Sequence, residues 1–227
     1  MKKRVAILID GDFYIRKYMQ YFKKTYPTIT LIELSKDLYT HCMKHIRNDS
    51  EELYRIFFYD CKPITKKVHK PITNQAYDLS KTEQCIFRTK LHKILSSKPC
   101  LSLRFGYLDE NNATWKIKSD KLLLDIIKGK KSLTDLEDKD FIYYAKQKGV
   151  DMRIGLDIST LSLKKQVERI VLISGDSDFV PAAKLARREG IIFTLDPMGN
   201  PIREDLNEHI DFLKTTLPNY FKNRNNI

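Results

Sequence analysis

The chain has 227 residues, of which 42% are hydrophobic, so it can build a substantial core and is not an intrinsically disordered protein. Its formal net charge of +12 favours polyanionic partners such as nucleic acids, because cations near a polyanion release its condensed counterions. The four cysteines form no C-x-x-C pair, which is typical of reduced thiols in a cytoplasmic protein. The apolar run before Asp10 is too short for a signal peptide or a membrane span, so we expect a cytoplasmic protein without a membrane partner.

The first half of the chain begins with short apolar runs that alternate with helical patterns. Residues 4–9 and 53–59 read as buried strands, and apolar side chains recur at helical spacing over residues 13–23 and again after Ser35, a plausible helix cap. Residues 62–104 differ, because ten lysines and arginines against two acids give this segment a net charge of +8. We expect a basic insertion at about 62–118 that contains a helix over residues 80–95.

The second half continues the alternation of strands and helices. We expect a hairpin of residues 100–108 with 114–118, a solvated helix and linker over 119–139, helices over 151–165 and 179–189, strands over 169–174 and 191–195, and helical spacing over 203–217. Strands that are apolar on both faces and alternate with helices predict a mostly parallel sheet covered by helices. We assign residues 1–218 to one domain and residues 219–227 to a polar tail.

Aspartates follow the predicted strands. Asp10 ends the first strand, Asp176 and Asp178 follow a later one, and Asp151 begins a predicted helix. Because ligand sites of such sheets form beyond the carboxyl ends of the strands, we expect these four side chains to converge at one edge. Carboxylates this close repel one another unless a cation joins them, and a hard divalent cation such as Mg²⁺ prefers oxygen ligands. A basic protein with such a site is suited to phosphodiester hydrolysis.

Each aspartate also has a structural interpretation. Asp10 precedes a glycine and Asp176 follows one, so both fit turns, and Asp151 and Asp178 fit helix caps. Asp157 and Asp12 are candidates for a supporting role, and Ser174 and Ser177 for orienting ligands or for turns and caps. Three further aspartates that follow strands, Asp60, Asp109 and Asp196, read as turn residues. The histidine pair His41 and His45 has i, i+4 spacing but lacks the glutamate of a metalloprotease motif, so we read it as incidental.

Three motifs resemble one family in their order along the chain. ILIDGDF near the N-terminus, QKGVDMRIGLDI over residues 147–158 and VLISGDSDFVPAAKLARREG over 171–190 resemble the NYN domain family, in its LabA-like branch of the PIN-like nuclease superfamily. The resemblance implies a three-layer α/β/α sandwich with a mostly parallel central sheet and a Mg²⁺- or Mn²⁺-dependent ribonuclease. It puts the metal ligands at Asp10, Asp151, Asp176 and Asp178, with Asp157 in support. Phe13 stands where many members have asparagine, which leaves the role of Asp12 open.

Two other functions compete with a metal-dependent endoribonuclease. ILIDGDF also resembles the first motif of haloacid dehalogenase-type phosphatases, with Asp10 as the nucleophile, although QKGVD has no counterpart there. A PIN-like protein that binds RNA without cleaving it is the third reading, and fold alone does not exclude it. The expected partner is RNA, with single-stranded RNA as one form, and the sequence leaves monomer and dimer both open. The candidate phosphate contacts are Lys66, Lys67, Lys70, Arg88, Lys90 and Lys148.

Overall fold

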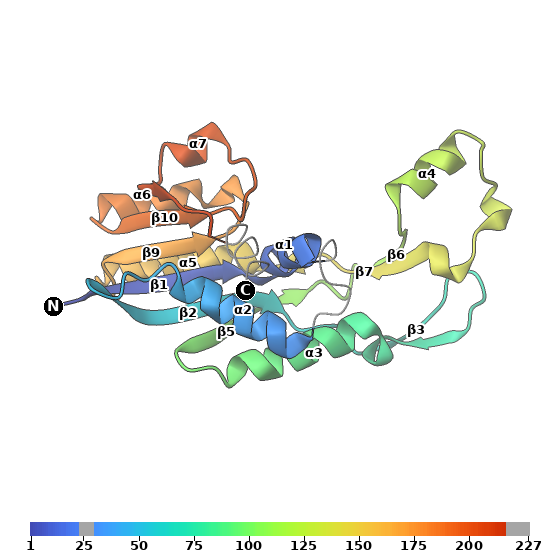
Figure 1. Cartoon of the computed structure of the whole chain (residues 1–227). Coiled ribbons are helices and arrows are strands. Elements are labelled where there is room, and N and C mark those ends of the chain that lie inside the picture. The colour runs from blue at the N-terminus through green and yellow to red at the C-terminus, as the bar shows by residue number, and fades with distance from the viewer. Residues whose placement is uncertain (23–29, 217–227) are drawn as a thin grey trace. The chain divides into compact units, whose positions relative to one another are not determined.

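A computed structural model describes residues 1–22 and 30–216. In this part of the chain the main sheet has seven strands in the order β11-β10-β9-β1-β2-β5-β8, all parallel to their neighbours except β8 (Figure 1). The strands are β1 Lys3–Asp10, β2 Glu51–Cys61, β5 Leu101–Leu108, β8 Gln147–Lys148, β9 Arg169–Ile173, β10 Ile192–Asp196 and β11 Phe212–Leu213. Strand β9 is RIVLI and every residue in it is buried, as expected for a central strand with helices on both faces.

Helices cover both faces of this sheet, which confirms the predicted α/β/α sandwich (Figure 1). Helices α1 Gly11–Phe22, α2 Leu31–Met43 and α3 Glu83–Ser96 lie on one face, and α5 Val150–Leu163 and α6 Val180–Arg188 lie on the other. A short helix, α7 Glu204–Asn207, follows β10. Helix α5 contacts β1 and β2, and α6 contacts β10, through apolar positions that alternate at helical spacing.

The strand order reverses between β1 and β9. The chain runs from β1 to β2 and β5 in one direction, then returns through α5 to β9 and continues to β10 on the opposite side of β1. In open α/β sheets, ligands bind beyond the carboxyl ends of the strands at such a reversal. Asp10 ends β1, and Asp176 and Asp178 follow β9, so these motifs lie at this point of the sheet.

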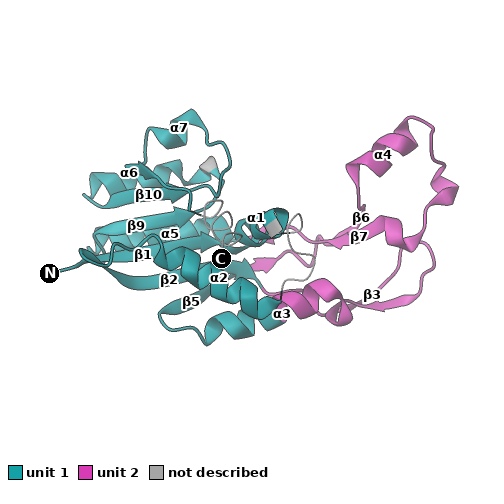
Figure 2. Ribbon diagram, in the orientation of Figure 1, with its two compact units in different colours: residues 1–61, 90–106, 149–227 teal, residues 62–89, 107–148 magenta. Residues whose placement is uncertain are grey.

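The chain divides into two compact units (Figure 2). The larger consists of residues 1–61, 90–106 and 149–227, and the smaller of residues 62–89 and 107–148. The expected insertion at 62–118 therefore falls across both units, and the tail expected at 219–227 lies outside the described residues. The smaller unit contains the hairpin β3 Lys67–His69 with β4 Ala76–Asp78, helix α4 Asp120–Ile127, and the pair β6 Thr114–Ile117 with β7 Phe141–Tyr144.

Three details of the sequence-based prediction are wrong. The segment at 114–118 does not form a hairpin with β5; β6 pairs with β7, where the Trp115 ring packs edge-on against Tyr143 with centroids 5.3 Å apart. Helix α2 begins four residues before Ser35, because Thr30 and Glu33 form a reciprocal capping box. The helical spacing of residues 203–217 yields a four-residue helix and the edge strand β11, which pairs with β10.

No helix in the described ranges combines the length and the apolar character needed to span a membrane.

Candidate active site

Asp10 is half-buried at the junction of β1 and α1. Its Oδ1 accepts a hydrogen bond of 3.1 Å from the backbone N–H of Phe13, as a helix-capping carboxylate does. The pKa of Asp10 is raised to about 6, mainly by burial and in smaller part by the charges of Asp12 and Asp151, against the lowering effects of the Phe13 N–H and Arg16. Asp10 therefore has the structural role at the start of α1 that one interpretation predicts, and its raised pKa adds to that role.

Asp151 lies in the first turn of α5. The preceding Gly149 has a left-handed backbone (φ 76°), which a side chain rarely adopts and which lets the chain turn from β8 into the helix. Asp151 is exposed and forms no capping hydrogen bond at the start of α5. Partial desolvation raises the pKa of Asp151, and the negative charges of Asp176 and Asp178 raise it further. The carboxylate of Asp151 is therefore repelled by the negative charges of both aspartates in the loop after β9.

The loop after β9 presents Asp176 and Asp178. The buried Ser174 hydroxyl oxygen accepts from the Asp176 N–H at 3.2 Å, and Asp176 Oδ1 accepts from the Asp178 N–H at 3.0 Å. Helix α6 begins at Val180 with Phe179 in the N-cap position and no side-chain cap, so Asp178 does not cap it. Asp176 thus shapes the turn, as one reading predicted, while Asp178 remains an exposed carboxylate without a capping role.

The four aspartates differ from their neighbours in how their charge is balanced. No lysine or arginine within residues 1–22 and 30–216 forms an ion pair with Asp10, Asp151, Asp176 or Asp178. Asp12, by contrast, pairs with Arg16 (Oδ2 to Nε, 2.9 Å). The four unpaired carboxylates couple electrostatically in a chain from Asp10 through Asp151 to the β9 loop.

Carboxylate oxygens with no cation of the protein beside them fit a hard divalent cation that keeps several waters. No three of the four aspartates bring their carboxylate oxygens within 4.8 Å of one another. Among the described residues, only the group of His41, His45 and Asp196 brings its donor atoms this close together.

Asp157 lies on α5 but faces protein partners. Its Oδ2 accepts a 2.7 Å hydrogen bond from the buried Tyr59 hydroxyl and lies 3.3 Å from Nε of Arg104. Burial, with the contribution of Asp157, raises the pKa of Tyr59 strongly, so the hydroxyl stays a donor. The sequence did not indicate Tyr59 or Arg104, because each becomes a partner of Asp157 only when β2 and β5 pair beside α5.

Glycines allow the close packing behind these loops. A Cβ at Gly175 would lie 2.6 Å from the Phe13 ring and 3.0 Å from Nδ2 of Asn200, and a Cβ at Gly11 would lie 2.5 Å from the Tyr59 carbonyl oxygen. Real Cβ atoms do not approach other heavy atoms this closely, so both positions need glycine. The loop after β9 therefore lies against both α1 and the segment after β10.

Several of the expected RNA contacts already have partners within the smaller unit. Lys148 pairs with Asp109 at 2.6 Å, Lys66 donates to the Glu110 carbonyl at 3.2 Å, and Lys70 lies 3.9 Å from Asp138. Lys67 and Lys90 are exposed, on β3 and α3, and Arg88 is half-buried on α3. Asp109 is therefore an ion-pair partner rather than a turn residue alone.

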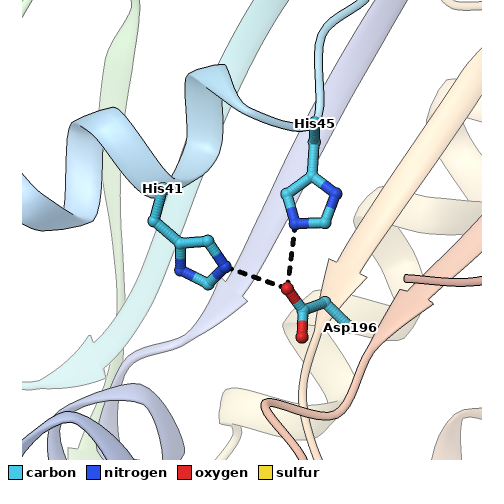
Figure 3. Close-up of side chains that lie close together, drawn as sticks. All are labelled: His41, His45 and Asp196. Atoms are coloured by element: carbon cyan, nitrogen blue, oxygen red, sulfur yellow. Dashed lines mark hydrogen bonds and ion pairs between the residues drawn. The ribbon is translucent and has the colours of Figure 1, made fainter. Parts of the chain in front are cut away.

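The sequence-based interpretation of a second group of side chains, two histidines and an aspartate, is wrong. His41, His45 and Asp196 come together in the core, with each histidine Nε2 2.9 Å from Asp196 Oδ2 (Figure 3). The histidine pair is therefore not incidental, and Asp196 is not a simple turn residue. Asp60 is likewise buried, with its Oδ2 2.8 Å from His92 Nε2. The i, i+4 spacing of His41 and His45 was the available signal, but the third member is more than 150 residues away.

Comparison with known proteins settles the family. The sequence model of the NYN domain matches residues 58–211, which is most of the chain. The chain belongs to the NYN domain family. This match includes Asp151, Asp157, Asp176 and Asp178 and does not extend to β1 and Asp10. NYN domains belong to the PIN-like nuclease superfamily, so the chain has a nuclease-type fold.

Among solved structures, the chain resembles the crystal structure of a protein of unknown function from Vibrio parahaemolyticus. The two are 14% identical with a TM-score of 0.47, over 94% of this chain and 93% of that one. No curated protein matches the sequence significantly.

Proposed function

We propose that this NYN domain is a Mg²⁺- or Mn²⁺-dependent endoribonuclease that hydrolyses RNA phosphodiester bonds. Asp10, Asp151, Asp176 and Asp178 would hold the cation at the carboxyl ends of β1 and β9. The observation that carries the proposal is that these four carboxylates influence one another while none has a lysine or arginine partner among the described residues. When bound, a divalent cation lowers the pKa of a water molecule and stabilises negative charge on a phosphoryl oxygen.

The chain itself contributes the rigidity of the ligands. The Phe13 N–H orients the Asp10 carboxylate, and the Ser174 hydroxyl and Asp178 N–H hold the turn around Asp176. Ligands held by backbone hydrogen bonds lose little conformational entropy when they bind a cation or substrate. Asp157 and Asp12 are already neutralised by Arg104 and Arg16, so we assign both a supporting role outside the ligand set.

RNA is the proposed partner because of the net charge of +12. The exposed Lys67 and Lys90 are the first candidates for phosphate contacts. The other candidates are Lys66, Lys70, Arg88 and Lys148. Three of these, Lys66, Lys70 and Lys148, would have to exchange partners within the protein for phosphate. The competing function is RNA binding without cleavage, which the same charge would support. The match to the NYN domain favours a nuclease over a haloacid dehalogenase-type phosphatase.

The test is a cleavage assay on end-labelled single-stranded and hairpin RNA, with Mn²⁺, with Mg²⁺ and with chelator. Wild-type protein should cut only with the cation, and Asp176→Asn should lose at least about 100-fold of the rate. Asparagine keeps the oxygen that accepts the Asp178 N–H, so this variant preserves the turn while removing the charge. Asp205→Asn, a surface carboxylate paired with Arg203, is the matched control and should cut like wild type.

The assay also separates the alternatives. Equal cleavage by wild type and Asp176→Asn would assign the activity to another site or to a contaminant, and the proposal would fail. If neither protein cuts RNA but both retard it in a gel-shift assay, the non-catalytic RNA-binding function is correct.

A further inference from the structure

We propose that His41, His45 and Asp196 form a second cation site, for Zn²⁺ or a similar transition metal, that is distinct from the four aspartates. Their three donor atoms all lie within 4.8 Å of one another, and they are the one group of metal-ligating side chains in residues 1–22 and 30–216 to do so. Two imidazoles and one carboxylate are a common ligand set for zinc.

The local structure directs the three side chains to one point (Figure 3). His41 lies in the last turn of α2, and His45 follows the C-cap Lys44, so the two rings are about one helical turn apart on the same side. Their centroids are 5.5 Å apart. Asp196 is the last residue of β10, and its Oδ1 accepts a 2.8 Å hydrogen bond from the Met198 N–H, which fixes the carboxylate with Oδ2 toward both histidines.

The chemistry of the cluster suits a cation. All three side chains are buried, with exposed fractions of 0–1%. A divalent cation bound by two imidazoles and one carboxylate would place its charge beside Asp196 in the buried interior, where water cannot solvate that carboxylate.

The surroundings contain polar atoms without partners. Nδ1 of His41, Nδ1 of His45 and the hydroxyl of Tyr14 are buried, and none has a hydrogen-bond partner within the described structure. The Tyr14 ring lies 5.7 Å from that of His41. Buried unsatisfied polar atoms are rare in folded proteins. A cation held through Nε2 of both rings requires the Nδ1–H tautomer of each histidine and would not contact these three atoms, so the case for the cation rests on Nε2 of the two rings and Oδ2 of Asp196.

The ligand types separate this site from the aspartates by metal preference. Imidazole nitrogens favour zinc and cobalt, whereas Mg²⁺ prefers oxygen ligands and retained water. The neighbouring Cys42 is also buried, but its sulfur is not among the donor atoms that meet in this group. A buried site of this kind is structural: it would join α2 to β10 and, through the Met198 N–H, secure the loop that carries Asn200 beside Gly175.

The experiment uses untagged full-length protein stripped with chelator, and Co²⁺ and Zn²⁺ as probes. In excess Mg²⁺, which would occupy the aspartate site, wild-type protein should bind one Co²⁺ with the visible absorption of a four- or five-coordinate nitrogen-ligated ion. Zn²⁺ should displace this Co²⁺, and the excess Mg²⁺ should not. In His45→Gln, the side-chain amide can still donate to Asp196, but the affinity for Zn²⁺ should fall at least about 100-fold. His92→Gln is the matched control, because His92 is also buried and bonded to a carboxylate, and it should bind Zn²⁺ like wild type.

Two further measurements make the result decisive. Asp10→Asn should bind Zn²⁺ with unchanged affinity, since Asp10 belongs to the other site. X-ray absorption at the zinc edge of the wild-type protein should show imidazole scattering, and it needs no variant to fold. The proposal is overturned if wild-type protein binds neither probe, or if His45→Gln binds both as wild type does.

Discussion

The ring of Phe13 packs directly against Gly175, so closely that a Cβ at residue 175 would lie 2.6 Å from Cε2 of the ring. Phe13 is buried in the first turns of α1, and Gly175 lies between Ser174 and Asp176 in the loop after β9. The contact connects the carboxyl ends of β1 and β9, where Asp10 and Asp176 lie. An aromatic ring at position 13 is therefore a packing element of the candidate site, even though many NYN domains have asparagine there.

Gly175→Ala should destabilise the protein by about 1–3 kcal/mol, the usual cost of overpacking a well-filled site. The added methyl group forces the Phe13 ring away and shifts the Asp176 turn, so RNA cleavage should fall as well. Urea unfolding followed by circular dichroism gives the change in free energy.

Two variants test this explanation. Phe13→Leu should recover part of the loss when combined with Gly175→Ala, because the smaller side chain leaves room for the methyl group. Gly155→Ala, at a helical position with no atom within 4 Å of the added Cβ, should be neutral or stabilising by about 0.5–1 kcal/mol. Additive losses in the double variant would mean that the ring is not the obstacle.

Asp10→Asn should stabilise the protein at neutral pH in chelator while it abolishes cleavage. The folded-state pKa of Asp10 is about 6 against an ordinary 3.8, so the wild-type protein is most stable with Asp10 protonated, below about pH 4. That stability is lost as the pH rises through about 6, and the variant does not lose it. At pH 7.5 the variant should be more stable by about 1–3 kcal/mol, and the difference should vanish near pH 4.

Asp12→Asn is the control for this pH dependence, since Asp12 is only partly buried and pairs with Arg16. It should change the stability by less than about 1 kcal/mol at either pH. Mn²⁺ should raise the thermal midpoint of wild-type protein and leave that of Asp10→Asn unchanged. A wild-type stability that stays flat between pH 4 and pH 7.5 would contradict the burial of the Asp10 charge.

Asp157→Asn should retain RNA cleavage within about tenfold of wild type, unlike Asp176→Asn, which should lose at least about 100-fold. The reason is that Asp157 is engaged by Tyr59 and Arg104 and not by the other aspartates. Initial rates of cleavage at saturating Mn²⁺ provide the comparison. Equal losses in the two variants would place Asp157 in the ligand set.

Glu51→Gln should lower the free energy of unfolding by about 3–5 kcal/mol, because it leaves the buried Arg169 guanidinium without its counterion. The two side chains are 2.9 Å apart and 3–5% exposed. The matched control is Arg203→Gln, which breaks the exposed pair with Asp205 and should cost less than about 1 kcal/mol. Similar losses in the two variants, measured by urea unfolding, would show that burial does not determine the strength of these pairs.

Local patterns in the sequence were enough to predict the parallel sheet and the positions of the aspartates along it. The all-apolar segment of β9, the glycine stop after α6 and the aspartates at strand ends are properties of neighbouring residues, so they can be recognised without the fold. The hairpin at 114–118 failed because the turn signal at Asn111 and Asn112 does not specify which strand becomes the partner. The partner of β6 is β7, whose residues lie 24 or more positions further along the chain than those they pair with.

The sequence by itself therefore determined the family, the α/β class and the set of aspartates that follow the strands. The pair of Asp12 with Arg16 is a local i, i+4 pattern within α1. Only the tertiary structure decided that Arg104 neutralises Asp157, because this contact needs β2 and β5 to pair beside α5. It also decided that Asp196 meets His41 and His45. Charge balance and burial depend on residues far apart in the chain, and no local pattern of residue types contains that information.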